Sequence, residues 1–526
     1  MRRGKPVQVA SSARGIDAAT FSAQSRKVFI LLFALILLSS ITLKIYKADR
    51  VGIIYDESMT FMHYCDSVHT ALNSYTHPNN HVLNSIFIYY AHKFFGFYEH
   101  FIRMPSLLAG IVFSLALAYI IRRTIESDAM RVASLALVSF VPFVFDYSYL
   151  ARGYAFALAG IYTAIAFVFW LDKHKMSWRW WPIPVFGISL MNFLTFGSML
   201  SSVLLLAAFN LAFVLFYSPA NFRNVSGKIK PVIVNLVSVF LVSFTSVFVL
   251  YRNIYKEIPN VRTFVNKQES WKGWPSFVGY LHNLLIGKVF RRNDSLGEVI
   301  FYAVVLLLVI SFGMYIYKFR KAVKAGLWRD YLKPHKPRAF IFIVTGLAII
   351  FMFVYGVILN KSLGFIRSQV FLIPLVVMSV AIMLDGLVNN LAKGAPGRVM
   401  RIIVMVVLLS VTVRNLPSLY RMGGSTLSGP ILRKLKAIDP DKTWNIAFSK
   451  KMKLFYMGFL YYNQFDYKFN IIRQGEYDVL ICKKKERPAG AVSLNWEPFS
   501  DSNCDVVINC PLPSDRVVLD ARLIED

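Results

Sequence analysis

A polar stretch from Tyr55 to Pro105 holds most of the side chains that could do chemistry. It opens on two adjacent carboxylates, Asp56 and Glu57, and it contains six of the nine histidines in the chain. A positioned carboxylate can act as a general base, and imidazoles can line a pocket for a polar ligand. Because apolar segments flank this stretch on both sides, it predicts an active site at a membrane surface.

The two carboxylates allow a second interpretation. They stand at the start of a segment in which Met59, Met62 and Cys65 recur at helical spacing, which predicts an amphipathic helix lying on the membrane. Acidic residues at a helix start cap the helix and complement its dipole. Asp56 and Glu57 are therefore either helix-capping or catalytic groups.

A second segment of the same stretch, His81 to Phe95, follows Pro78 and Asn79. We expect its polar residues His81, Asn84 and His92 to share one face and to point back at the carboxylates. None of the histidines makes the i, i+4 pair with a nearby acid that is typical of a zinc helix. Polar lining of a sugar pocket is favoured over metal ligation, and the metal stays unknown.

Composition defines the class of protein. Hydrophobic residues make up 56% of the 526 residues and charged residues only 17%, and the mean hydropathy is +0.49. These values are typical of a polytopic membrane protein. The formal net charge of +30 would fit a nucleic-acid partner, but no basic patch accompanies a nucleic-acid-binding motif. We therefore expect no nucleic-acid partner.

About eleven apolar runs have roughly the length needed to cross ~30 Å of hydrocarbon. They are Val28–Leu43, Met104–Ile121, Val132–Phe145, Ala155–Leu171, Ile183–Leu194, Met199–Phe216, Val232–Tyr251, Val299–Tyr317, Ala339–Leu359, Gln369–Leu387 and Ile402–Val413. The sequence thus predicts a transmembrane domain over 28–414, preceded by a basic cytosolic tail over 1–27.

Basic residues indicate the orientation of these predicted spans. Short connections on the side of the amino terminus are basic, as at Arg122, Arg123 and Arg131, whereas those near Phe196 and Gly364 hold few positive charges. By the positive-inside rule, the amino terminus is cytosolic. The first loop (47–103), the loop 252–298 and the tail 415–526 then face outward, and the expected location is a bacterial inner membrane.

The predicted spans contain no Asp, Glu, Lys or Arg in their central portions. Buried mid-membrane charge usually marks an ion or proton pathway, so its absence argues against a coupled transporter. The polar chemistry gathers at the outer rim, where Arg103 and Arg152 each lie at the end of an apolar run. These arginines either extend to the membrane interface or clamp a phosphate.

Five motifs occur in order along the chain. They are Asp56-Glu57-Ser58, the run from His77 to His81, the run from Arg103 to Gly110, Pro142-Phe143 followed by the run from Tyr147 to Ala155, and the run from Arg367 to Leu375. In this order and topology they resemble the GT-C glycosyltransferases, and most of all the branch with the protein O-mannosyltransferases and the aminoarabinose transferases of lipid A. The resemblance covers the first 170 residues well and the remainder mainly by hydropathy.

The resemblance implies a hexosyl- or pentosyltransferase. It would move a sugar from a polyprenyl-phosphate donor to a glycan, lipid or protein acceptor on the outer side, with inversion. A lipid-linked sugar flippase or transporter is the alternative. No tightly bound cofactor is implied, a divalent metal stays open, and the oligomeric state is unknown.

The resemblance also implies roles for individual residues. Asp56 would be the general base, and Glu57 would orient the acceptor or a metal. Arg103, Arg152 and Arg367 would bind the donor phosphate. The acceptor or sugar pocket would contain His77, Asn80, His81 and Asp146.

One departure from the family concerns the second outer loop. Relatives commonly have Tyr-Ser-Gln-Glu-Ala-Arg where this chain has the run from Tyr147 to Arg152, so the second-loop acid is missing. Either Asp146 takes its place or the site works without it. Asp146 is alternatively an interfacial charge at the end of a helix.

Two further regions lie on the predicted outer side. The loop 252–298 is rich in aromatic residues and cations, and it either rests at the interface or forms a lid with Arg291 or Arg292 on the phosphate. Residues 415–526 predict a small α/β domain, with strands at Trp444–Phe448, Tyr477–Cys482, Val506–Asn509 and Val517–Leu519 and a helix at Met452–Tyr462. Cys504 and Cys510 are placed where a disulfide is permitted.

Overall fold

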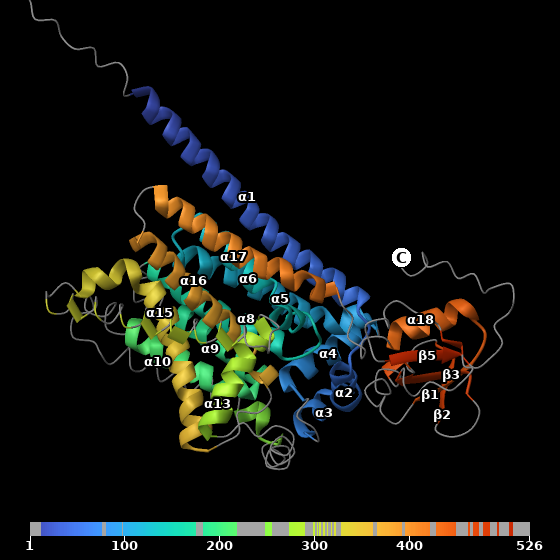
Figure 1. Cartoon of the computed structure of the whole chain (residues 1–526). Coiled ribbons are helices and arrows are strands. Elements are labelled where there is room, and N and C mark those ends of the chain that lie inside the picture. Colours follow the sequence, from blue (N-terminus) through green and yellow to red (C-terminus); the bar gives the residue numbers. More distant parts are fainter. Residues whose placement is uncertain are drawn as a thin grey trace, which may run out of the picture.

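The structure is a computed structural model of the whole chain. It describes residues 12–75, 80–96, 98–174, 182–217, 248–254, 273–289, 328–360, 366–391, 395–420, 428–448, 461–462, 467–472, 477–483, 492–493 and 504–508, with single residues or pairs between 298 and 324. It consists of a helical bundle with a smaller unit of one helix and a β-sheet at one end (Figure 1).

The bundle contains long apolar helices that lie side by side (Figure 1). They are α1 (Ser12–Arg50), α5 (Glu99–Thr124), α6 (Asp128–Ser139), α8 (Tyr154–His174), α9 (Pro182–Ser198), α10 (Val203–Tyr217), α15 (Trp328–Phe353), α16 (Leu372–Leu391) and α17 (Ala395–Tyr420). Among the described residues, four helices are long and apolar enough to cross a membrane: Arg26–Arg50, Glu99–Thr124, Tyr154–Lys173 and His335–Ile358. The protein is therefore mostly helical, as the composition predicts.

Most of the predicted apolar runs coincide with helices, but one is broken. The run Val132–Phe145 divides into α6 and the short α7 (Pro142–Asp146), because Pro142 lacks the N–H that would continue the first helix and takes the first position of the next. The runs Val232–Tyr251 and Val299–Tyr317 fall mostly outside the described residues. The number of spans therefore stays a prediction.

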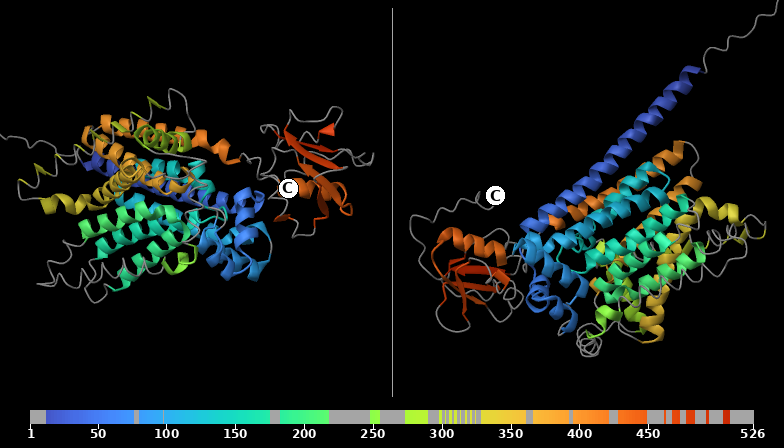
Figure 2. Two further views of the ribbon diagram at one scale, coloured as in Figure 1. Left: turned by 90° about the horizontal axis from the view of Figure 1, so that it is seen from below. Right: turned by 180° about the vertical axis from the view of Figure 1, so that it is seen from behind.

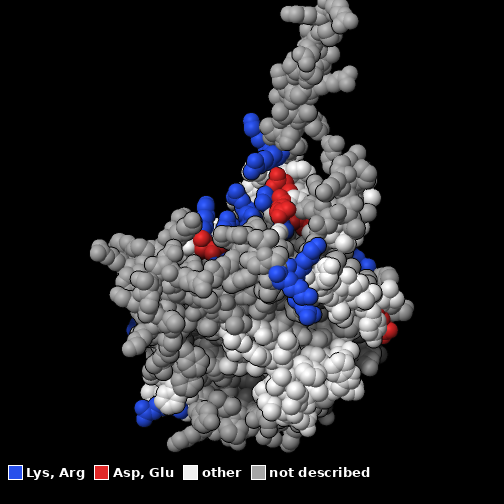
Figure 3. Space-filling view, turned by 90° about the vertical axis from the view of Figure 1, so that its left-hand side faces the viewer, with Lys and Arg blue, Asp and Glu red and all other residues white. Residues whose placement is uncertain are grey.

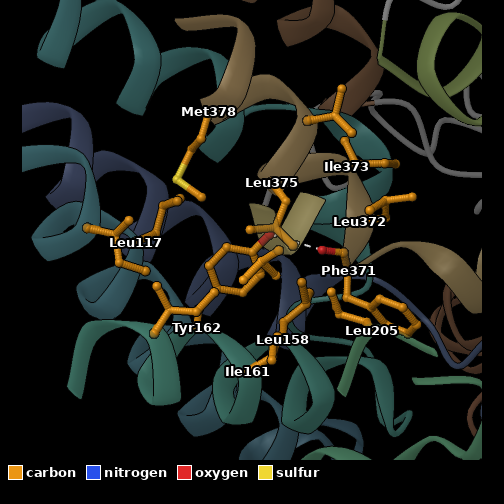
Figure 4. Packing of buried hydrophobic residues seen from close by; sticks show 14 of the residues in the cluster. Leu117, Leu158, Ile161, Tyr162, Leu205, Phe371, Leu372, Ile373, Leu375 and Met378 are labelled. Carbon is orange, nitrogen blue, oxygen red and sulfur yellow. Dashed lines mark hydrogen bonds between the residues drawn. The ribbon is translucent and has the colours of Figure 1, made fainter. Parts of the chain in front are cut away.

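The core of the bundle lies between α5, α8 and α16 (Figure 4). Leu117, Leu158, Leu375 and Met378 are fully buried there, and the Tyr162 hydroxyl donates a hydrogen bond to the backbone carbonyl of Phe371 over 3.0 Å. This bond satisfies the one polar atom of the Tyr162 side chain in an apolar layer. It also joins α8 to the segment that follows Arg367.

The end of the bundle away from the sheet carries exposed positive charge (Figure 3). Here Asp385 on α16 accepts hydrogen bonds from the backbone N–H groups of Glu126 and Ser127 over 2.9 and 3.2 Å, and Arg338 pairs with Asp385 over 3.3 Å. Arg122 is exposed near this connection. Arg122, one of the basic residues used to orient the chain, thus lies at this end of the bundle.

One charge lies deeper in a span than predicted. Helix α1 continues past Leu43 to Arg50 and carries Lys44 into the bundle, where 1% of the side chain is exposed. The Lys44 ammonium donates to the Ser114 hydroxyl over 2.6 Å and lies 5.7 Å from the centre of the Phe145 ring. These contacts offset part of the cost of burying the charge.

The first loop (47–103), which is predicted to face outward, folds into three helices. They are α2 (Tyr55–Tyr64), α3 (Val68–Asn73) and α4 (Val82–Phe95). The predicted amphipathic helix is thus two helices, because Ser67 interrupts it and caps α3 by accepting a hydrogen bond from the Thr70 N–H over 3.0 Å. His81 is the residue that precedes α4.

The smaller unit contains α18 (Ser428–Ile438) and a five-stranded sheet in the order β2-β1-β3-β5-β4. The strands are β1 (Trp444–Phe448), β2 (Phe469–Ile472), β3 (Val479–Lys483), β4 (Val492–Ser493) and β5 (Cys504–Ile508). Strand β1 is parallel to β2 and β3, whereas β5 is antiparallel to β3 and β4. In all views this unit lies beside the first outer loop (Figures 1 and 2).

The sequence predicts three of these strands and misses two. Strand β1 has the predicted bounds, and β3 and β5 lie within two residues of theirs, whereas β2, β4 and α18 were not predicted. The predicted strand Val517–Leu519 and most of the predicted helix Met452–Tyr462 lie outside the described residues. Cys510 does too, so its disulfide with Cys504 stays a prediction.

Candidate active site

The candidate site centres on the carboxylate of Asp56, in the first turn of α2. One of its oxygens, Oδ2, lies 2.5 Å from Nη1 of Arg152 and 2.8 Å from Nη1 of Arg367. The Asp56 side chain is 14% exposed, that of Arg152 1% and that of Arg367 31%. Three distant parts of the chain therefore bring one acid and two guanidinium groups together, and one of the guanidinium groups reaches solvent.

The two arginines control the protonation of Asp56. Burial by itself would raise the pKa of this carboxyl, but the positive charges of Arg152 and Arg367 outweigh burial and lower its pKa below the ordinary value. Asp56 is consequently ionised at neutral pH and held in an ion-paired form.

His81 completes this group. Its Nε2 atom lies 3.2 Å from Nη2 of Arg152, and its ring packs edge-on against Tyr154, with centroids 5.3 Å apart. Burial, assisted by the charge of Arg152, lowers the pKa of His81 well below its ordinary value. The imidazole is therefore neutral at physiological pH, and its Nε2 atom faces the arginine.

Glu57 has a separate set of partners, although it is adjacent to Asp56 in the chain. Its carboxylate is fully buried and lies against Arg103, with Nε to Oε1 at 2.8 Å and Nη2 to Oε2 at 2.5 Å. Oε1 also accepts from the Ala151 N–H over 2.7 Å, and Oε2 accepts from the Ile54 N–H over 3.1 Å. Glu57 thus ties the start of α2 to the second outer loop.

The predicted phosphate-binding role of Arg103 needs correction. Besides Glu57, its guanidinium donates to the backbone carbonyls of Ala48, Val51 and Gly52. These bonds use all five N–H groups of the side chain, which is 0% exposed. Arg103 therefore has no donor left for a phosphate in this arrangement, and it holds the connection between α1 and α2.

The second outer loop packs closely against the first. Asn84 donates to the carbonyl of Ala151 over 3.2 Å, and the Ser106 hydroxyl donates to the Asn84 side-chain oxygen over 3.1 Å. Gly153 is needed here, since a Cβ atom on it would collide with the carbonyl of Ser198. Arg152 lies between these contacts, so the loop has little freedom to move its guanidinium.

Two predicted pocket residues have other partners. The Asn80 amide donates to the carbonyls of Ala71 and Ser74 over 2.9 and 2.7 Å and is 2% exposed, so it fastens α3 to α4 instead of lining a pocket. Asp146, at the end of α7, pairs with Lys47 of α1 over 3.4 Å. This contact favours the interpretation of Asp146 as an interfacial charge over a catalytic one.

Some of the remaining predicted site residues lie in the part of the chain that the structure describes, and others do not. His77, Arg291 and Arg292 lie outside the described residues. The described part of the loop 252–298 includes α13 (Gly273–His282), where Phe277 packs edge-on against Phe353 with centroids 5.6 Å apart. Within the described ranges, no three His, Cys, Asp or Glu side chains are grouped so that they could hold a metal ion.

Two tyrosines at the site were missed as functional candidates. The rings of Tyr147 and Tyr154 are 4.3 Å apart, and the centre of the Tyr154 ring lies 5.4 Å from Cζ of Arg152. Burial raises the pKa of Tyr147, so its hydroxyl stays protonated. Both residues belong to the motif that ends at Ala155.

Two of the solved structures that are similar to this chain belong to one protein, in its apo and its ligand-bound state. ArnT from Cupriavidus metallidurans in the apo state has a TM-score of 0.45 and 13% identity, over 92% of this chain and 98% of that chain. ArnT bound to undecaprenyl phosphate has a TM-score of 0.42 and 11% identity, over 91% of this chain and 98% of that chain.

A second similar protein is the archaeal oligosaccharyltransferase AglB from Archaeoglobus fulgidus, in complex with an inhibitory peptide and a dolichol-phosphate. Its TM-score is 0.44 at 11% identity, over 86% of this chain and 69% of that chain. No protein-family model and no curated protein matches the chain. At identities this low, the function has to be argued from this chain's own residues.

Proposed function

We propose that the protein is a membrane glycosyltransferase that moves a sugar from a polyprenyl-phosphate donor to an acceptor on the outer side of the membrane, with inversion. The observation that carries the proposal is the convergence of Arg152 and Arg367 on Asp56. A general base and a pair of phosphate-binding cations are the groups that this reaction needs.

The chemistry assigns one role to each group. Asp56 accepts the proton of the acceptor hydroxyl as that oxygen attacks the anomeric carbon of the sugar. The bond from this carbon to the phosphate oxygen breaks, and Arg152 and Arg367 stabilise the charge that the phosphate gains. Guanidinium groups suit this task because their planar donors match phosphate oxygens in pairs. One base is enough, because a polyprenyl phosphate is already a good leaving group.

The ion pairs of Asp56 also affect when the base is active. A carboxylate held by two guanidinium groups has a lowered pKa and is a weak base. A donor phosphate competes for the same guanidinium groups, of which Arg367 is the more exposed. Donor binding would therefore loosen the ion pairs and make Asp56 more basic in the donor complex than in the free protein.

The donor class tests this proposal directly. Purified protein should transfer sugar from a polyprenyl-phosphate sugar and not from a nucleotide sugar, because the site offers two guanidinium groups without a nucleotide-binding motif. Formation of the new glycosidic bond is measured by mass spectrometry. A flippase would form no such bond in detergent.

The matched control for the donor assay is Arg152→Lys. This change keeps the charge but not the planar fork, so the transfer rate should lie between that of the wild type and that of a protein without a cation at this position. Efficient transfer from a nucleotide sugar with the polyprenyl form inert would contradict the proposed mechanism.

The pH dependence of transfer gives a second prediction. Asp56 must be ionised to act as a base, and its folded-state pKa is lowered, so activity is present above that pKa and is lost as the pH falls through it. For kcat/KM, which reports the free enzyme, the acid limb should lie below the ordinary Asp value of about 3.9. For kcat, the acid limb should lie at higher pH, because the bound donor phosphate competes with Asp56 for the two arginines and so raises the pKa of Asp56.

Several groups near Asp56 enter this pH profile. They are Arg152, Arg367, His81, Tyr55 and Tyr147. Arg152 stays charged throughout, and His81, Tyr55 and Tyr147 stay neutral near pH 7. Removing one cation in Arg367→Gln should move the kcat/KM limb to higher pH. Identical limbs for kcat and kcat/KM would show that the donor does not compete for the arginines.

A further inference from the structure

The smaller unit makes a polar contact with the connection that leads to Asp56. We call residues 51–54, between α1 and α2, the linker. The hydroxyl of Tyr462, a residue that is 1% exposed, accepts a hydrogen bond from the Ile53 N–H over 3.3 Å. The same hydroxyl donates to Oε1 of Glu99 over 2.5 Å. Tyr462 thus bridges the linker and the start of α5. Its contact on the linker, Ile53, lies three residues before Asp56.

The adjacent residue contacts the helix that carries Asp56. The ring of Tyr461 packs edge-on against Phe61 of α2, with centroids 5.3 Å apart. Arg433 of α18 reaches Glu99 over 3.3 Å, so the bridge is attached to α18 as well. The unit therefore holds both the linker and the middle of α2.

A shared apolar core supports these contacts. It joins α18 and the sheet to both outer loops, and it consists of Ile53, Phe61, Cys65, Ile88, Ile102, Ala151, Ile431, Leu432, Leu435, Ile438, Trp444, Ile446, Tyr461, Tyr462, Phe469, Val479 and Ile481. Two members flank the site: Ile53 lies on the linker, and Ala151 immediately precedes Arg152. Packing of the unit therefore affects the positions of both ion-pair partners, Asp56 and Arg152.

We infer that the smaller unit positions Asp56 for catalysis, and that Tyr462 is the positioning residue through which it acts. This inference rests on the proposed function. The linker carbonyls of Val51 and Gly52 accept hydrogen bonds from Arg103, so a displaced linker would also disturb the Glu57 network. Small displacements matter here, because general-base catalysis requires hydrogen-bond distance between base and hydroxyl.

The test is Tyr462→Phe in the full-length protein. This change keeps the ring and removes the hydroxyl, which leaves the Ile53 N–H without this acceptor. We expect kcat to fall by about tenfold to a hundredfold, since misplacement of a catalytic group by about 1 Å costs up to 10²-fold. The KM for the polyprenyl donor should change little, because Arg152 and Arg367 are untouched. Thermal melting should show that the variant is folded.

The matched control is Tyr461→Phe, which keeps the ring contact with Phe61 and leaves the bridge intact. It should retain the kcat of the wild type. Glu99→Gln weakens the same bridge from its other end, so it should lower kcat, and its effect should not add to that of Tyr462→Phe. This second variant keeps the inference testable if Tyr462→Phe does not fold.

Four outcomes can be told apart. A folded Tyr462→Phe protein with the kcat of the wild type would overturn the inference, as would a Glu99→Gln protein with the kcat of the wild type if Tyr462→Phe does not fold. Additive effects of Tyr462→Phe and Glu99→Gln would overturn the bridge as the route. A wild-type protein that transfers no sugar from any polyprenyl donor would instead reject the proposed function.

Discussion

Asp56→Asn is expected to abolish sugar transfer while the protein stays folded and inserted in the membrane. The amide has nearly the same shape as the carboxylate, but it cannot accept the proton of the acceptor hydroxyl. Losing a general base costs typically 10²–10⁴ in rate. Single-turnover assays with a polyprenyl-phosphate sugar measure the loss.

The variant also leaves Arg152 and Arg367 without the charge that they face, so their availability to phosphate should be retained or increased. Binding of the polyprenyl phosphate without sugar is the control, and it should be at least as tight as in the wild type. Normal turnover by Asp56→Asn would exclude Asp56 as the base. Loss of both turnover and binding would indicate a collapsed site.

Arg103→Ala is expected to lower the free energy of unfolding by more than it weakens the free energy of donor binding. The change leaves the carboxylate of Glu57 buried without its cation, and it removes the donors from the carbonyls of Ala48, Val51 and Gly52. Removing one partner of a buried ion pair costs about 3–5 kcal/mol. The melting temperature and the yield of monodisperse protein in detergent measure the effect.

The double variant Glu57→Gln with Arg103→Met is the matched control. Removing both charges avoids the unpaired carboxylate, so it should recover part of the stability lost in Arg103→Ala. An Arg103→Ala protein with an unchanged melting temperature and weakened donor binding would contradict the structural role. That result would restore the phosphate-binding role that the motif suggests.

Hydropathy alone was sufficient to predict most of the helical framework. An apolar segment has to fold as a helix to satisfy its backbone in a membrane, so Met104–Ile121 and Ala155–Leu171 read directly as α5 and α8. Strand β1 was predicted with its bounds because a short, mostly apolar run is bounded by polar residues on both sides. The short β4 depends on its pairing with β5, which local patterns do not report. The break at Pro142 has a local cause, the missing N–H of the proline, but the hydropathy of the run does not show it.

The residues of the candidate site were likewise predicted from the sequence only in part. The residue types and their positions indicated Asp56, His81 and Arg152, because paired acids and arginines at the ends of apolar runs are unusual. Arg367 was indicated by the resemblance to the GT-C glycosyltransferases. Asp146 and Asn80 were grouped with them because of their sequence position. The structure gives Asp146 a lysine of α1 and gives Asn80 two backbone carbonyls, and neither contact has a local signal.

The sequence by itself determined which residues are available for the site: two adjacent acids, three arginines and a mostly apolar framework. Only the tertiary structure decided which arginine meets which acid. Successive side chains on a helix point about 100° apart, since a turn has 3.6 residues. Asp56 therefore faces Arg152 and Arg367 at the rim, whereas Glu57 faces Arg103 in the interior. Two residues of similar chemistry thereby receive separate tasks, one in the proposed reaction and the other in holding the loops together.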